Sequence, residues 1–321
     1  MSGEAGTAEL LADRGEAAAS EEFFRSRPFL DAEGVTHTLR IEAGGDALMA
    51  PLIVRQIGEG PERDAISPYG YPGFAAAGFT RPRARVKPAA AIDPASIDFS
   101  ATGLVSAFVR HALGDPPLAG ATERNTVQVA DPALPSKSRG SDRNQINRNR
   151  RNGYEVRLVP GPDTTAEDRA AFLAAYEQTM RRTRAAEHYL FAAEYFDRVL
   201  ESSRTWLALV DSPGGDVAAA SIAAASDGYL HYYLSGSADA HLRDSPMKNV
   251  VAALVEHATD LPLPLNLGGG ITPGDRLEEF KRGFANRQHP WHTSELICNP
   301  TVYERLSARH KPSTFFPAYR S

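Results

Sequence analysis

A glycine triplet and the apolar run before it have the clearest chemical potential in this sequence. Gly268 to Gly270 follow the short apolar run 263–267 and therefore stand at the expected end of a strand. Glycine allows a backbone to approach a ligand closely. The triplet is not a dinucleotide fingerprint, because Pro273 stands where the third glycine of Gly-x-Gly-x-x-Gly belongs. We expect it to border a ligand site of another kind.

Four tyrosines are further candidates for substrate contact. Tyr69 and Tyr71 lie in the loop 67–73, which packs two prolines and two glycines into seven residues and so excludes regular structure. We expect a rigid, irregular loop whose tyrosines could close over a substrate. Tyr232 and Tyr233 occupy successive positions of an expected strand, so their side chains point to opposite faces. Core packing is the alternative role for each tyrosine.

Positive charge concentrates in residues 137–157. This segment holds seven basic residues against two acidic ones, whereas the whole chain has a formal net charge of -5. The acidic balance argues against a protein that coats nucleic acid without specificity, although a local basic face can coexist with it. Arginines interleaved with asparagines could bind phosphates. A solvated linker between domains explains the same pattern.

Bulk properties bound the class of protein. A length of 321 residues predicts two domains of about 150 residues each. The single cysteine, Cys298, excludes an intrachain disulfide and fits a reducing cytoplasm. The apolar run 217–226 is about half as long as a bilayer span, so no membrane partner is expected. No phosphate-binding loop, His-Glu-x-x-His pair or Gly-x-Ser-x-Gly elbow occurs, and the scattered histidines predict no metal site.

The first half predicts a hairpin and a helix that covers a sheet. Segments 35–42 and 48–57 are rich in strand-forming residues and flank a Gly44-Gly45 turn signal. Apolar residues recur at helical spacing over 100–113. A short strand is expected at 125–130.

The second half predicts alternating strands and helices. Thr164 to Glu167 form a capping box that opens a helix, and Ser245 with Pro246 opens another. Two further helices are expected at 192–202 and 275–284, and strands at 205–211, 217–225, 229–235, 263–267 and 292–299. Turn residues make the first three of these strands an antiparallel meander. The order is β-α-α-β-β-β-α-β-α-β.

This order is similar to the fold of the GNAT acyltransferases, and motifs along it resemble the Fem-type branch of that superfamily. The motifs are Tyr176 to Arg182, Tyr189 to Phe191, His231 to Gly236, Leu267 to Gly270 and Leu277 to Phe284. Fem-type proteins include aminoacyltransferases that build peptidoglycan bridges and relatives in natural-product pathways. The coiled-coil arm common in bridge-building members has no counterpart in this sequence, so a cell-wall substrate is not assumed.

The resemblance implies an α+β (mixed α/β) fold of two tandem GNAT-like domains, with mixed central sheets flanked by helices. We expect a disordered leader at 1–20 and a degenerate GNAT-like domain at 21–152. The GNAT acyltransferase domain follows at 153–300, and a tail at 301–321 is expected to pack back on the first domain.

The resemblance also implies the roles of individual residues. Phe280 and Lys281 resemble the Phe-Lys pair near the Fem reaction centre, where an ammonium could stabilise developing negative charge or hold the donor's terminal ribose. An exposed lysine on an amphipathic helix is the alternative. The expected substrate-binding residues are Tyr69, Tyr71, Tyr176, Arg182, Tyr232, Gly268, Gly269 and Gly270, and the candidate tRNA-binding residues are Arg143, Arg148, Arg150 and Arg151.

The segment 238–246 bears on the identity of the donor. In coenzyme-A-dependent GNAT enzymes the corresponding loop is glycine-rich and presents N–H groups to the pyrophosphate. This segment has no glycine, and Pro246 lacks an N–H. The absence favours aminoacyl-tRNA over acyl-CoA as the donor.

We therefore predict a cytoplasmic acyltransferase that makes an amide bond. It would move an aminoacyl group, without a permanently bound cofactor, from aminoacyl-tRNA to the amine of a small molecule or peptide. An acyl-CoA-dependent GNAT N-acyltransferase is the first alternative, and an inactive binding protein of the same fold is the second. The oligomeric state is left open.

Overall fold

The computed structural model describes residues 6–76, 91–114, 116–311 and 314–321. Their contacts group the chain into two compact units. Unit 1 comprises Met1–Arg124 and Pro290–Ser321, and unit 2 comprises Asn125–His289. Residues 125–152, expected in the first domain, are grouped with unit 2. The reason is that two elements of this segment contact unit 2. Strand β8 (Thr122–Ala130) pairs with β13 (Leu265–Gly268), and helix α2 (Gly140–Arg151) packs on α5 (Met247–Asp260).

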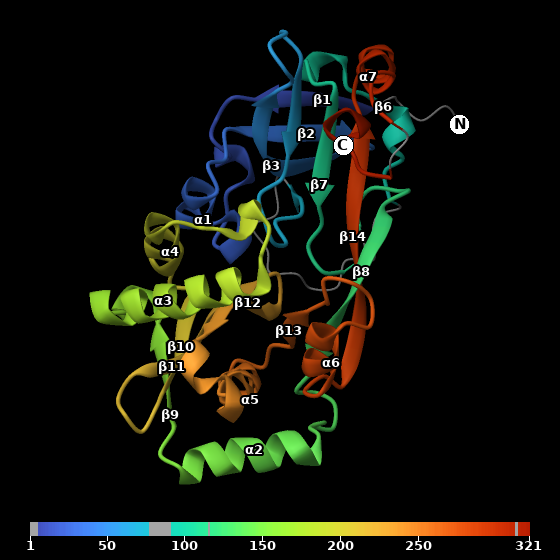
Figure 1. Ribbon diagram of the computed structural model, residues 1–321. Coiled ribbons are helices and arrows are strands. Elements are labelled where there is room, and N and C mark those ends of the chain that lie inside the picture. Colours follow the sequence, from blue (N-terminus) through green and yellow to red (C-terminus); the bar gives the residue numbers. More distant parts are fainter. Residues whose placement is uncertain (1–5, 77–90, 115, 312–313) are drawn as a thin grey trace. The chain divides into compact units, whose positions relative to one another are not determined.

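Unit 1 is built on a mixed sheet. Its strand order is β6-β1-β2-β3-β4-β7-β14, and β5 pairs with β3 (Figure 1). The bounds are β1 Gly6–Leu11, β2 His37–Ala43, β3 Asp46–Gln56, β4 Arg63–Ile66, β5 Ala75–Ala76, β6 Ile97–Asp98, β7 Ser106–Arg110 and β14 Arg287–Ile297. The expected hairpin is confirmed, since β2 and β3 pair antiparallel around Gly44 and Gly45.

The helix expected at 100–113 is wrong. The segment contains a short 3-10 turn, Ser100–Thr102, followed by β7, which pairs with β4 and β14. Ala107 and Val109 are fully buried in this strand. A strand in the interior of a sheet reads as a continuous apolar run, which periodicity alone does not distinguish from a buried helix.

The disordered leader is also wrong for its described part. Residues 6–11 form β1, which pairs antiparallel with β2, and residues 16–18 form a 3-10 turn. Ala8 is buried and Leu10 packs on the same core, whereas Glu9 points out and pairs with Arg40. This alternation of apolar and polar residues is the strand signal that the Ala/Glu-rich composition concealed. Residues 1–5 of the expected leader lie outside the described residues.

The C-terminal residues complete unit 1. Helix α7 (Pro300–Ser307) is capped by Asn299, whose Oδ1 accepts the Val302 amide at 3.1 Å. Beyond it, Tyr319 hydrogen-bonds to Ser106 at 2.7 Å. Arg320 donates to the buried carboxylate of Asp64. These contacts attach the tail to β4 and β7.

Unit 2 follows the expected order. It runs β9-α3-α4-β10-β11-β12-α5-β13-α6 after β8 and α2, with β14 beginning at its end. The bounds not given above are β9 Glu155–Pro160, α3 Ala166–Thr183, α4 Ala193–Leu200, β10 Thr205–Asp211, β11 Val217–Ser226, β12 Tyr229–Ser237 and α6 Arg276–Arg282. The strand order is β8-β13-β12-β11-β10-β9, and β10, β11 and β12 form the expected antiparallel meander. The mixed α/β fold class is confirmed.

Helices cover both faces of the sheet of unit 2. Both α3 and α5 pack against β11 and β12 (Figure 1). The alanine-rich β11 is buried along almost its whole length, as a strand covered on two sides must be. Helix α3 approaches so closely that a Cβ on Gly236 would lie 2.4 Å from the Ala175 backbone.

The ladder between β12 and β13 is short, and this positions the candidate site. The two strands are parallel and pair only at Leu230 with Leu265 and at His231 with Asn266. Strand β12 continues to Ser237, whereas β13 ends at Gly268. The two strands therefore separate within the sheet at the glycine triplet.

Candidate active site

Lys281 and the glycine triplet are brought together in unit 2. Lys281 lies on α6, and its Nζ donates a hydrogen bond of 2.7 Å to the carbonyl of Gly269. Asp275 starts the helix by accepting the Glu278 amide at 2.8 Å, and it also accepts the Ile271 and Thr272 amides. One carboxylate thus fixes both the helix and the loop that joins it to β13.

Burial changes the chemistry of Lys281. Only 8% of the residue is exposed. Burial lowers the pKa of its ammonium from 10.5 to about 8, and the nearby Asp275 carboxylate partly opposes this change. Lys281 is therefore not the exposed surface lysine that the sequence left open. A cation with this pKa can donate hydrogen bonds at neutral pH and can also exchange its proton readily.

The glycines are required by close contacts. A Cβ on Gly269 would lie 2.2 Å from the side-chain amide of Asn125, and one on Gly270 would lie 2.5 Å from Asp275. Gly268 has a φ of 74°, a left-handed conformation that favours glycine. The triplet is therefore a tight turn with polar side chains packed against its backbone.

Phe280 and Tyr232 pack against the core of unit 2. The Phe280 ring meets Phe284 edge-on at 5.6 Å. Tyr232 donates to Ser235 Oγ at 2.6 Å, and burial raises the pKa of its hydroxyl to about 12. Their contact with substrate stays a prediction.

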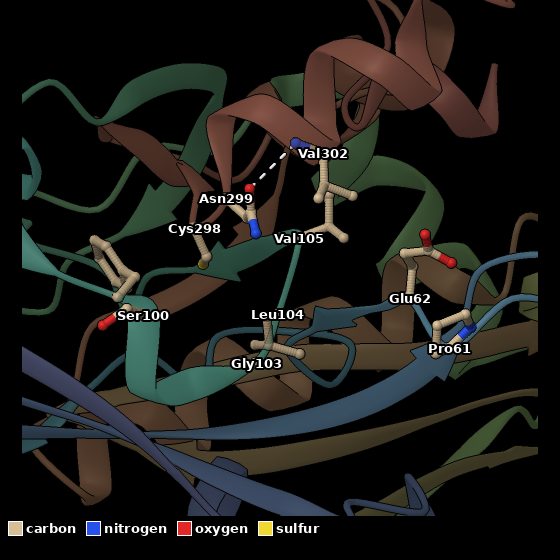
Figure 2. Close-up of a pocket in the computed structure, with 10 residues that line it drawn as sticks. Pro61, Glu62, Ser100, Gly103, Leu104, Val105, Cys298, Asn299 and Val302 are labelled. Carbon is tan, nitrogen blue, oxygen red and sulfur yellow. Dashed lines mark hydrogen bonds between the residues drawn. The ribbon is translucent and has the colours of Figure 1, made fainter.

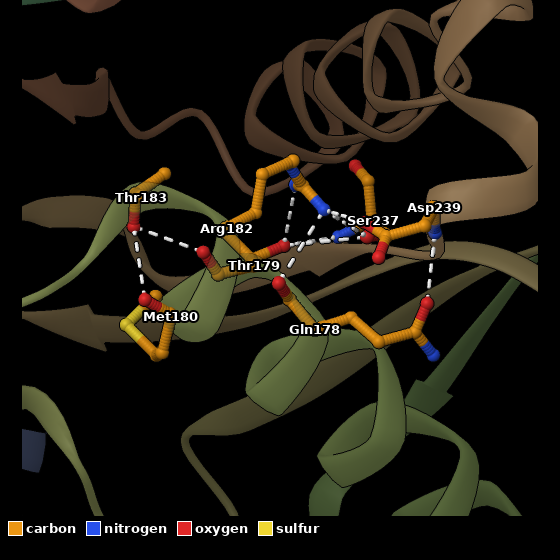
Figure 3. Close-up of polar contacts among 7 residues, drawn as sticks. All are labelled: Gln178, Thr179, Met180, Arg182, Thr183, Ser237 and Asp239. Carbon is orange, nitrogen blue, oxygen red and sulfur yellow. Dashed lines mark hydrogen bonds and ion pairs between the residues drawn. The ribbon is translucent and has the colours of Figure 1, made fainter.

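Tyr176 and Arg182 are engaged within unit 2. Tyr176 is buried on α3, where it stacks on Phe172 and donates to the Tyr189 carbonyl at 2.7 Å. Arg182 pairs with Asp239 and donates to Thr179 Oγ1 and to the Ser237 carbonyl (Figure 3). These bonds hold the end of β12 against α3, which accounts for both residues without a substrate.

Tyr69 and Tyr71 belong to unit 1. Their loop is irregular, as expected, and Arg110 secures it through the Ser67 carbonyl and hydroxyl. The Tyr69 amide donates to Glu33, and Tyr71 packs edge-on against Phe24 and Trp291. Their role at the acceptor stays a prediction.

The backbone of the segment 238–246 is largely committed to internal bonds. It forms a 3-10 turn, Asp239–Asp244, and Ser245 adopts a left-handed φ of 49° instead of capping α5 with its side chain. The Ala238 amide donates to the Ala218 carbonyl, and the Asp239 amide donates to Gln178 Oε1. The His241 amide donates to the Ala238 carbonyl, and the Ser245 amide donates to the Leu242 carbonyl. These donors point to acceptors within the protein, unlike the amides of a phosphate-binding loop.

Carboxylates add negative charge to the same segment. Asp244 accepts from the Tyr154 hydroxyl at 2.9 Å, and burial is the main cause that raises the pKa of Tyr154 to about 12. His241 bonds to Asp216 at 2.8 Å and to Tyr154 at 3.1 Å. Asp239 is the partner of Arg182. The segment also carries Arg243, so it presents side chains of both signs of charge.

The basic segment is a helix of unit 2, so the linker interpretation is wrong. α2 buries Asp142, Ile146 and Asn149, and the Asn149 amide donates to Asn249 Oδ1 and to the Asp244 carbonyl, each at 2.8 Å. Its exposed face carries the candidate tRNA-binding residues Arg143, Arg148, Arg150 and Arg151. Arg150 makes a 3.4 Å ion pair with Glu256, a surface contact of small energy.

A separate pocket of about 200 Å³ lies in unit 1 (Figure 2). Leu104, Val105 and Val302 contribute to its lining, together with Cys298 and Glu62. Burial raises the pKa of the Cys298 thiol to about 12, so the thiol stays protonated and is a poor nucleophile. Glu62 pairs with Arg305. The pocket shows no activated group.

Among the described residues, no cluster of three or more His, Cys, Asp and Glu side chains is placed to hold a metal ion. None of the helices described combines the length and apolarity that a bilayer crossing requires.

Sequence reasoning missed the polar residues that hold the glycine turn. Asn266 is the only polar residue in the run 263–267, and His231 stands between apolar residues in β12. Both are 1% exposed. An isolated polar residue in an apolar strand next to a glycine triplet was the available signal, because a buried polar group needs a specific partner.

Comparisons with known proteins agree with this architecture. Residues 136–282 match the family model described as an acetyltransferase (GNAT) domain. A search of curated proteins found no match. Solved structures similar to this chain include FemX, with 10% identity and a TM-score of 0.55 over 84% of this chain and 89% of that chain.

Two further solved structures are also similar. The C-terminal domain of a putative lysylphosphatidylglycerol synthetase from Agrobacterium fabrum has 14% identity and a TM-score of 0.56 over 91% of this chain and 93% of that chain. L-PGS from Bacillus licheniformis has 12% identity and a TM-score of 0.52 over 87% of this chain and 90% of that chain. At these identities the likeness concerns the fold. Residues 136–282 therefore match a GNAT domain, and the chain as a whole has a fold similar to that of FemX.

Proposed function

We propose that unit 2 transfers an aminoacyl group from aminoacyl-tRNA to the amine of a small molecule or peptide. The observation that carries this proposal is the buried Lys281 ammonium bonded to the Gly269 carbonyl, beside the point where β12 and β13 separate. The GNAT domain supports an N-acyltransferase, and the donor and the acceptor are the proposed parts.

The reaction requires few side chains. The uncharged acceptor amine attacks the carbonyl carbon of the aminoacyl ester and forms a C–N bond, and the carbonyl oxygen becomes an oxyanion. The intermediate then collapses and breaks the C–O bond to the terminal ribose of the tRNA. The ribose oxygen gains a proton and the former amine nitrogen loses one. The products are an amide and a tRNA without its aminoacyl group. Positioning the two reactants supplies much of the rate.

Lys281 is suited to stabilise the charge that develops in this reaction. A lysine ammonium has three N–H donors, and the described residues engage one of them, at Gly269. A further N–H could donate to the oxyanion or to the departing ribose oxygen. Hydrogen bonds from a buried cation are strong because little water screens them. With a pKa of about 8, Lys281 also exchanges a proton easily near neutral pH.

Two features favour tRNA over coenzyme A. The segment 238–246 commits backbone amides to internal acceptors, which disfavours a pyrophosphate. The exposed arginines of α2 offer phosphate contacts on the same unit. An acyl-CoA donor is the second candidate, because the matching family model is described as an acetyltransferase domain.

A donor assay separates these candidates. The protein is incubated with a mixture of small amines and peptides and with either ¹⁴C-aminoacyl-tRNA or ¹⁴C-acetyl-CoA. We expect labelled amide from the tRNA donor only, and ribonuclease treatment of that donor should abolish it. Amide formation from acetyl-CoA that resists ribonuclease would replace the proposal with the second candidate.

A further inference from the structure

A chain of buried polar groups runs from β12 to the glycine turn. His231 on β12 bonds to the Ser226 carbonyl at 3.2 Å through Nε2 and to Asn266 Nδ2 at 3.0 Å through Nδ1. Asn266 Oδ1 accepts the Gly268 amide at 2.8 Å. The Gly269 carbonyl that follows is the acceptor of Lys281. Every link from Ser226 to Lys281 is therefore a direct hydrogen bond or a covalent path within a side chain or the backbone.

The chemistry of the partners orients each group in this chain. A carbonyl only accepts, so Nε2 of His231 must carry the proton that meets Ser226. Burial lowers the pKa of His231 to about 4, so the ring is neutral at neutral pH and its Nδ1 is an acceptor. The Asn266 amide must then present Nδ2 to His231 and Oδ1 to the Gly268 amide, and neither end can be exchanged.

Asn125 holds the other side of the turn. Its Nδ2 donates to the Gly270 carbonyl at 3.1 Å. The same amide occupies the space that a Cβ on Gly269 would need, 2.2 Å away. The turn thus has an asparagine bonded to the residue on each side of Gly269.

We propose that Asn266 is a positioning residue: through the Gly268 amide it fixes the turn so that the Gly269 carbonyl meets the Lys281 ammonium. Asn125 supports the same turn from Gly270. A merely well-packed strand would place an apolar residue at 266, because a buried amide is unfavourable unless both of its ends are bonded. The inference rests on the proposed function only in treating Lys281 as catalytic.

The test follows the titration of Lys281 in the free protein. The chain has five lysines, so selective labelling with ¹³Cε-lysine gives few signals, and Lys281→Arg assigns the one of interest. We expect Asn266→Ala to lower the midpoint of the Lys281 titration, because the buried ammonium loses its carbonyl acceptor. One charge-assisted hydrogen bond corresponds to about a tenfold change in proton affinity.

A matched control separates positioning from general destabilisation. Asn249 is also 1% exposed in unit 2, but its side chain bonds to Asn149 and the Ile146 carbonyl. Asn249→Ala should lower the melting temperature and leave the Lys281 midpoint unchanged. If Asn266→Ala does not fold, Asn125→Ala perturbs the same turn from a partly buried position and should displace the midpoint in the same direction.

The outcomes are distinct. An upward displacement in Asn266→Ala would contradict the inference, because the ammonium would then be held better without the positioned Gly269 carbonyl. A midpoint equal to that of the wild type, or one displaced equally in Asn249→Ala, would overturn it. The titration needs neither donor nor acceptor, so a failed transfer assay leaves it standing. Conversely, if the protein is active and Asn266→Ala leaves the midpoint of the Lys281 titration unchanged, the inference is refuted and the proposed function stands.

Discussion

Replacing Lys281 with methionine should stabilise the fold at pH 7 and remove turnover. Methionine has a similar length and no charge, so it fills the same space without a buried cation. The fall in the pKa of Lys281 from 10.5 to about 8 means that the folded protein holds this proton more weakly than the unfolded chain does. Between these values the unfolded state binds more protons, so wild-type stability rises with pH across this window.

The size of the effect follows from the pKa. The change from 10.5 to about 8 corresponds to roughly 3 kcal/mol against the charged form in the folded state. Methionine removes this penalty but leaves the Gly269 carbonyl without its donor, a loss of about 1 kcal/mol. We therefore expect Lys281→Met to be about 2 kcal/mol more stable than the wild type at pH 7, and this advantage to vanish by about pH 10.

Urea unfolding of both proteins at pH 7 and pH 10 measures this difference. The advantage of Lys281→Met should be largest at pH 7, where the wild-type ammonium is charged, and turnover at pH 7 should be lost. A variant that is less stable than the wild type at pH 7, with a gap that does not depend on pH, would refute the reasoning. It would mean that the ammonium stabilises the fold and that its burial has another explanation.

Three further changes test neighbouring parts of the account. Gly269→Ala should displace Asn125, because the side-chain amide of Asn125 would lie 2.2 Å from the new Cβ. The loss of about one hydrogen bond should lower turnover by about tenfold in a steady-state assay. Unchanged turnover would contradict the tight turn. Tyr154→Phe removes the hydrogen bond to Asp244. It should lower the free energy of unfolding, measured by urea denaturation, by about 1–2 kcal/mol. An unchanged free energy of unfolding would show that this hydrogen bond contributes nothing to stability. Arg148→Ala should weaken tRNA binding and reduce the slope of log K against log salt by about one in filter binding, and an unaltered slope would exclude a phosphate contact at this residue.

Most of unit 2 was predictable from the sequence because its signals are local. Turn residues separate β10, β11 and β12, and these three strands lie where they were expected. The capping box at the start of α3 uses Thr165 and Asp168, one residue after the expected position. β1 and β7 were missed because strands whose burial depends on distant partners resemble other structures in a local window.

The candidate site was predictable in part. Lys281 and the glycine triplet stand out by residue type, and their hydrogen bond places them in contact, while their role in a functional site stays a prediction. The supporting residues were not predictable, because Asn125 and Asn266 reach the turn from strands that are far apart in the sequence. Spacing along the chain also could not show that Arg182 would pair with Asp239, since that ion pair depends on how α3 packs over β12.

The donor is tested most directly by the melting temperature of the protein with three ligands: aminoacylated tRNA, uncharged tRNA and coenzyme A. A ligand that binds only the folded state stabilises it by about 2.7 kcal/mol at a hundredfold excess over its Kd. We predict that aminoacylated tRNA raises the melting temperature most, and that coenzyme A leaves it unchanged. A rise with coenzyme A and none with aminoacylated tRNA would contradict the account.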